Sequence, residues 1–90
     1  MVTVIMTFDI SKSYAEWKSV YDGASHFISD AGFEVVYVGH TLEDERKCYW
    51  IVRVQNMDAL DAFMNNEDLH PVMGESGHIL ESTRIVACSA

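Results

Sequence analysis

Four side chains that can bind a ligand or move a proton fall near the ends of expected β-strands. They are Asp9, His40, Tyr49 and His78. Histidine titrates near neutral pH, so a group of this kind can bind a small acid, hold a metal ion or act as an acid or base. Strand ends are also where any sheet becomes polar, and an edge position is the commoner interpretation for such residues.

For the other residues of reactive type, a structural role is a better interpretation of the sequence than a chemical one. His26 and Asp30 are four positions apart, a spacing that suits metal ligands but is more typical of a solvated helix face. Cys48 has no base beside it and is expected to be a buried thiol, and His70 precedes Pro71 at a helix break. The sequence contains no phosphate loop, metal-spaced cysteines or nucleophile elbow, so we expect no metal and no cofactor.

Hydrophobic periodicity predicts the elements that must position these groups. Residues 2–10, 33–40, 47–55 and 79–87 have the pattern of strands, and residues 14–31 and 57–73 have apolar side chains at helical spacing. Ser11 or Ser13 is expected to cap the first helix, with Glu16 three residues after Ser13 as in a capping box, and Asn56 or Asp58 is expected to cap the second, which Pro71 breaks or re-caps. The order βαββαβ predicts one ferredoxin-like α+β domain over residues 1–90. Its four-stranded antiparallel sheet would have the central strands first and third, and two helices on one face.

The first helix carries an aromatic stripe that allows two interpretations. Trp17, Tyr21, Phe27 and Ile28 can line a pocket between this helix and the sheet. A stripe at helical spacing is more often part of the core, which is the interpretation we prefer from sequence.

The second and third strands form a hairpin whose register decides which residues face the helices. A working register pairs Glu34 with Arg53 and Tyr37 with Trp50, and places the Tyr37–Trp50 face under the helices. The opposite face of the sheet is then half apolar. Soluble proteins rarely leave such a patch open, so we predict a homodimer with two sheets packed across a two-fold axis. The predicted apolar residues of this face are Ile5, Val36, Val38, Tyr49 and Ile51.

Composition limits the classes of partner. The formal net charge is −8, from 14 acidic and 6 basic residues, which disfavours nucleic acid and anionic membrane surfaces. The N-terminal residues lack a signal-peptide pattern, and no apolar run approaches the roughly 20 residues that span a bilayer. Cys48 and Cys88 can form one disulfide on number alone, but reduced thiols in an acidic cytoplasmic protein are the preferred expectation.

Three segments carry a resemblance to known proteins: FDISKSYAEWKSVYDG, YVGHTLED and MDALDAFMNNEDL. Together with the element order, they make the chain resemble the dimeric α/β-barrel superfamily of antibiotic-biosynthesis-monooxygenase type, and within it a short family of unknown function. That resemblance implies a ferredoxin-like dimer. The superfamily includes cofactor-independent monooxygenases and haem-degrading enzymes. The haem-degrading enzymes use an Asn on the first strand, a Trp on the third and a His on the second helix.

The chain matches the haem-degrading pattern only in part. Trp50 and His70 stand at two of the three positions, whereas the first strand has Thr7 and Asp9 and no Asn.

We therefore expect a homodimeric protein that binds a small hydrophobic or aromatic metabolite in a lumen between facing sheets. Two alternatives stay open: a cofactor-independent monooxygenase or isomerase using the same lumen, with His40 or Asp9 as the base, and a non-catalytic dimeric interaction module. The predicted ligand-binding residues are Asp9, Val36, Val38, His40, Tyr49 and Ile51.

Overall fold

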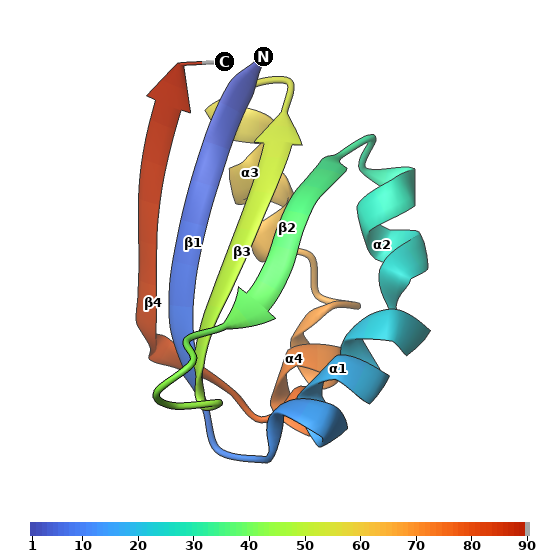
Figure 1. Cartoon of the computed structure of the whole chain (residues 1–90). Coiled ribbons are helices and arrows are strands. Elements are labelled where there is room, and N and C mark those ends of the chain that lie inside the picture. The colour runs from blue at the N-terminus through green and yellow to red at the C-terminus, as the bar shows by residue number, and fades with distance from the viewer. Residues whose placement is uncertain (90) are drawn as a thin grey trace.

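A four-stranded sheet lies against a layer of helices in the computed structural model, which describes residues 1–89 (Figure 1). The figure views the sheet from its uncovered side, with α3 behind the strands and α1 and α2 to their right. The elements in chain order are β1 (Val2–Ile10), α1 (Tyr14–Gly23), α2 (Ser25–Asp30), β2 (Glu34–His40), β3 (Lys47–Val54), α3 (Met57–Met64), α4 (His70–Ser76) and β4 (His78–Ser89).

The strands are antiparallel and follow the order β2-β3-β1-β4. The first and third strands are therefore central, and the predicted ferredoxin-like α+β fold is confirmed. The ends of β1 and β2 and the starts of β3 and β4 lie at one end of the sheet (Figure 1). Glu45 of the β2–β3 loop contacts the start of α1 there, because its carboxylate accepts from the Tyr14 backbone N–H.

Each of the two predicted helical regions is divided into two short helices. The first breaks at Ala24, whose φ of −109° and ψ of 13° leave the helical range. Gly23 precedes this break, and glycine weakens a helix because it gains the most backbone freedom on unfolding. In the second region Pro71 lies in the first turn of α4, which begins a new helix as predicted.

Of the predicted alternatives for the helix caps, Ser13 caps α1 and Asn56 caps α3. Ser13 Oγ accepts from the Glu16 backbone N–H at 3.2 Å, and Asn56 Oδ1 accepts from the Ala59 N–H at 2.8 Å. Gly77 ends α4 with a φ of 86°, a left-handed conformation that glycine adopts without the steric penalty of a Cβ.

The core lies between the sheet and the helices. Alternate residues of β1 and β3 are buried there, which is the period-two pattern of a sheet covered on one face. The buried side chains of these two strands are Val4, Met6, Phe8, Ile10, Cys48, Trp50, Val52 and Val54.

The predicted register of the β2–β3 hairpin is correct for the first two residues of β2 and wrong after them. Glu34 pairs with Arg53 as expected, but the register shifts between Val35 and Tyr37. Val36 is the extra residue, and a β-bulge of this kind moves every later side chain to the other face. Trp50 consequently pairs with Val38, not with Tyr37.

The uncovered face of the sheet is nevertheless apolar along one row. Tyr37 pairs with Ile51, Ile51 with Ile5, and Ile5 with Val86, so the row crosses all four strands. Tyr37 is 48% exposed and Val86 is 56% exposed. We call these four residues the apolar row.

Candidate functional site

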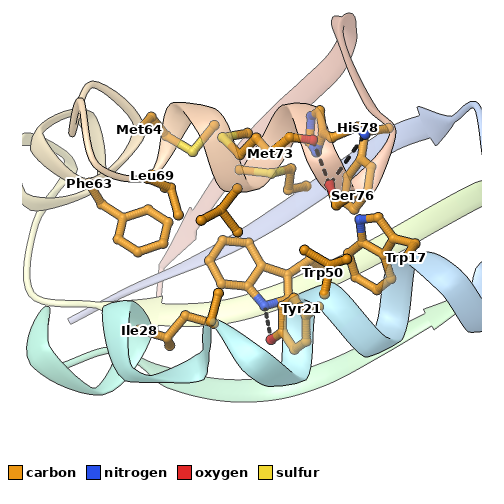
Figure 2. A pocket seen from close by; sticks show the side chains of 15 residues that line it. Trp17, Tyr21, Ile28, Trp50, Phe63, Met64, Leu69, Met73, Ser76 and His78 are labelled. Carbon is orange, nitrogen blue, oxygen red and sulfur yellow. Dashed lines mark hydrogen bonds between the residues drawn. The ribbon is translucent and has the colours of Figure 1, made fainter.

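A cavity of about 80 Å³ lies between the sheet and the helices (Figure 2). Its walls come from β1, β3 and the start of β4 on one side and from all four helices or their junctions on the other. The volume is several times the roughly 10–15 Å³ that one water molecule needs. The lining residues are Met6, Phe8, Trp17, Val20, Tyr21, Ala24, Ile28, Trp50, Phe63, Met64, Leu69, Val72, Met73, Ser76 and His78.

Strands and helices both direct side chains into the cavity, each with its own spacing along the sequence. Phe8 and Trp50 come from alternating positions on neighbouring strands, while Trp17 and Tyr21 are one helical turn apart on α1. The break at Ala24 changes the direction of the chain beside the cavity (Figure 1).

Aromatic rings make up much of the wall. The rings of Trp17 and Tyr21 stack at a centroid distance of 5.0 Å, and Phe8 lies 5.5 Å from Trp17. The indole N–H of Trp50 donates to the Tyr21 hydroxyl at 2.8 Å (Figure 2). Burial raises the pKa of Tyr21, and the hydrogen bond from Trp50 only partly opposes this effect, so its hydroxyl is neutral at physiological pH.

His78 supplies an imidazole at one end of the cavity. Its ring stacks on Phe8 with centroids 4.3 Å apart, and its Nε2 lies 2.8 Å from Oγ1 of Thr83. Its backbone N–H donates to Ser76 Oγ at 3.3 Å (Figure 2). Burial lowers the pKa of His78 to about 4, so the ring is neutral at pH 7.

The cavity can therefore hold an uncharged ligand but offers nothing to neutralise a charged one. Within residues 1–89, its lining includes no Lys, Arg, Asp or Glu. Burying an unpaired charge is costly, so an ionised carboxylate or ammonium group is disfavoured there.

The sequence-predicted ligand residues are divided between the two faces of the sheet. Tyr49 and Ile51 lie on the uncovered face, with Asp9 beside them opposite Lys47. Val38 and His40 pair with the buried Trp50 and Cys48, so the predicted placement of Val38 on the uncovered face is wrong, and His40 lies on the helical face beside it. The bulge residue Val36 is 54% exposed. Whether any of these residues binds a ligand stays a prediction.

His40 connects the end of β2 to the start of α1. Its ring contacts the Tyr14 ring at a centroid distance of 4.5 Å. Its Nδ1 lies 2.7 Å from the Thr41 carbonyl oxygen, which can only accept, so Nδ1 carries the proton. Glu45 of the same loop accepts from the Tyr14 backbone N–H at 3.0 Å. These contacts give His40 a structural role at the joint between sheet and helix.

The four residues expected at one end of the sheet are all found there, but they do not form one group. Asp9 and Tyr49 lie on the uncovered face, and His40 and His78 lie on the helical face. On the uncovered face a shallow polar depression of about 200 Å³ includes Asp9, Lys47 and Tyr49.

The haem-degrading pattern is not assembled. Thr7 pairs with Tyr49 on the uncovered face, whereas Trp50 is buried under the helices. His70 is exposed, and its Nε2 lies 3.0 Å from the Met64 carbonyl oxygen, to which it donates.

The remaining reactive groups add no second chemical site. Within residues 1–89, no three His, Cys, Asp or Glu side chains are placed to hold a metal ion. Burial raises the pKa of Cys48 to about 11, which keeps its thiol protonated. Cys48 and Cys88 are both free thiols. In the same part of the chain, each helix is too short or too polar to cross a bilayer.

Sequence reasoning preferred a filled core to a pocket for the stripe of the first helix, of which Trp17, Tyr21 and Ile28 line the cavity and Phe27 does not. The signal that favoured a cavity was the gathering of large aromatic and flexible side chains: both tryptophans of the chain line it, with Met6, Met64 and Met73. Periodicity shows that such residues face inward, but it cannot show that they leave a space between them.

The family model for DUF3764, a domain of unknown function, matches residues 1–90. The chain belongs to the DUF3764 family. No curated protein matches the sequence.

Solved structures similar to this DUF3764 chain share its fold at low sequence identity. SnoaB, a cofactor-independent oxygenase from Streptomyces nogalater, is 15% identical with a TM-score of 0.72, over 99% of this chain and 91% of SnoaB. A candidate antibiotic biosynthesis monooxygenase from Bordetella bronchiseptica is 13% identical with a TM-score of 0.79, over 99% and 95% of the two chains. An uncharacterised NIPSNAP domain protein from Burkholderia xenovorans is 9% identical with a TM-score of 0.75, over 100% and 94%. The predicted resemblance to proteins of monooxygenase type is thus confirmed for the fold.

Proposed function

We propose that this DUF3764 protein binds a small, uncharged, aromatic or apolar metabolite in the cavity between its sheet and helices. The observation that carries the proposal is a cavity walled by aromatic rings and lacking any lining Lys, Arg, Asp or Glu within residues 1–89. Small-molecule sites are typically of this kind: mostly apolar, with few polar groups that fix orientation.

The size of the cavity suits a ligand with a single ring. Burial of about seven carbons, as in toluene, gains roughly 5.6 kcal/mol at ~0.8 kcal/mol per carbon, and the cost of ordering leaves roughly 4–5.5 kcal/mol. This range corresponds to a Kd of roughly 0.1–1 mM for a probe that makes only apolar contacts. Methionine side chains adapt their shape readily, so Met64 and Met73 allow a natural ligand somewhat larger than the empty volume.

We further propose that the protein is a cytoplasmic homodimer formed through the uncovered sheet face. An apolar row that crosses the whole sheet is the kind of surface that soluble proteins cover. Two copies related by a two-fold axis would cover it with the same row from the partner.

A cavity-filling substitution tests the binding proposal. Val72 lines the cavity, and Val72→Phe should weaken toluene binding in calorimetry by at least tenfold while the protein stays folded. Leu42→Phe, at a fully exposed loop position, is the matched control and should bind toluene like the wild type. Equal affinity in the two variants would contradict binding in this cavity.

A second candidate site is the lumen between two facing sheets. The polar depression at Asp9, Lys47 and Tyr49 favours it, because two such depressions can meet in a dimer. A ligand in this lumen would be lost with Tyr49→Ala and retained in Val72→Phe. If no small molecule binds to the wild type or to either variant, the protein is better described as a dimeric interaction module.

The rival chemical function is oxygenation without a cofactor, the activity by which SnoaB is described. It would need both a bound ligand and a proton acceptor, and the neutral imidazole of His78 is the candidate in this cavity. Oxygen uptake on addition of the ligand distinguishes an oxygenase from a binding protein.

A further inference from the structure

We propose that His78 is the hydrogen-bonding residue of the cavity and that it selects ring ligands bearing a neutral hydroxyl group, that is, phenols. This inference rests on the proposed function, because it requires a ring to bind in the cavity.

An irregular segment of β4 fixes the position of His78. Thr7 pairs with Arg84 and Asp9 with Ile79, so residues 80–83 all lie opposite the single residue 8. Ser82 Oγ secures this bulge by accepting from the Asp9 N–H at 2.7 Å and donating to the Ile79 carbonyl at 2.6 Å. Bulges commonly re-aim a side chain next to a functional site.

The bulge brings Thr83 back to the ring of His78. Thr83 Oγ1 lies 2.8 Å from Nε2, and the Phe8 ring stacks on the imidazole with an interplanar angle of 16°. One ring nitrogen is therefore occupied, and the plane of the ring is fixed. The Thr83 hydroxyl can either donate or accept, so this contact fixes the position of the imidazole and leaves the other nitrogen for a ligand, which can also be a donor or an acceptor.

The second nitrogen, Nδ1, is free for a ligand. It has no hydrogen-bond partner among residues 1–89, and no side-chain N or O atom that is sealed from solvent lacks a partner there. Nδ1 therefore has access to solvent or to open space, and because His78 lines the cavity, we assign this nitrogen to the cavity.

A neutral imidazole discriminates between ligands by charge. It exchanges a hydrogen bond with a hydroxyl group, but it cannot neutralise a carboxylate, and the lining described above supplies no cation. Phenol should therefore bind in preference to both toluene and benzoate. Burial, which keeps the imidazole uncharged at neutral pH, supports this preference.

Four other polar groups belong to residues that line the cavity: the hydroxyls of Ser76 and Tyr21 and the indole N–H groups of Trp17 and Trp50. Ser76 Oγ already donates to the Met73 carbonyl at 2.7 Å and accepts from the His78 N–H, so it is occupied. The Tyr21 hydroxyl accepts from Trp50 and keeps its own hydrogen to donate. Substitution of His78 leaves Tyr21 in place, so it separates the two groups.

The experiment measures Kd for phenol, toluene and benzoate in the wild type, His78→Phe and Thr83→Val. In His78→Phe the preference for phenol over toluene should fall roughly tenfold, the value of one lost hydrogen bond, with toluene affinity kept within about threefold. Thr83→Val frees the ring and should lower the same preference without a loss of toluene binding. Benzoate should bind weakest to all three proteins.

The outcomes separate this inference from the proposed function. An unchanged phenol preference in His78→Phe, with toluene still bound, would overturn the role of His78 alone. Absence of toluene binding in the wild type would overturn the proposed function itself. If His78→Phe does not fold, ¹⁵N spectra of the wild-type imidazole decide: Nδ1 should shift with phenol and not with toluene, and equal shifts would refute the assignment.

Discussion

The buried imidazole of His78 should make the stability of the protein depend on pH in a defined window. In the folded protein, burial lowers the pKa of His78 from 6.5 to about 4. As pH falls below 6.5, the unfolded chain gains a proton on this ring while the folded chain does not, so the unfolded state is favoured. The loss of stability begins near the unfolded pKa and is complete near pH 4.

The size of the effect follows from the two pKa values. One pKa unit corresponds to about 1.4 kcal/mol, so the displacement from 6.5 to about 4 corresponds to about 3 kcal/mol. This is a large part of the total stability of a small domain, which is roughly 5–10 kcal/mol.

Urea unfolding followed by tryptophan fluorescence, repeated from pH 7.5 to pH 4, measures the effect. Other groups also titrate in this range, so the quantity of interest is the difference in unfolding free energy between the wild type and His78→Phe. Between pH 7.5 and pH 4, the wild type should lose about 3 kcal/mol of unfolding free energy relative to His78→Phe. A difference that stays constant with pH would refute the reasoning that His78 is buried as a neutral ring.

Three further substitutions test other parts of the structure. Tyr21→Phe leaves the indole N–H of Trp50 without its acceptor and should cost about 1–3 kcal/mol in urea unfolding; no loss would show that the hydrogen bond is replaced. Ile51→Lys places a charge in the apolar row and should dissociate the proposed dimer in light scattering, whereas Ile85→Lys, on the helical side of β4, should not. Ser13→Ala removes the cap of α1 and should cost about 1 kcal/mol, measured by thermal unfolding.

The fold could be predicted from the sequence because each element carries a local signal. Alternation in β1, the cap at Ser13 and the position of Pro71 all act within a few residues and agree with one another. The break at Ala24 was missed because apolar residues keep helical spacing on both sides of it. A break that preserves the apolar face changes no pattern that periodicity can detect.

Two of the predicted ligand residues, Val38 and His40, lie on the other face for a similarly specific reason. The single extra residue Val36 has the same β-branched character as its neighbours, so nothing in its type marks a bulge. The slip exchanged Tyr37 and Val38 between faces and moved His40 under the helices. The cavity itself depends on how completely side chains fill a volume, which sequence alone does not specify.

The central claim is that the space between sheet and helices binds a small ring compound, and the two tryptophans provide the most direct test. Trp17 and Trp50 are the only tryptophans of the chain, and both line the cavity. Their indole N–H signals in a ¹H–¹⁵N NMR spectrum therefore report on this site. Addition of toluene should shift both signals in a saturable way, with a Kd of roughly 0.1–1 mM. Indole signals that stay unmoved in a folded protein up to saturating toluene would contradict the account.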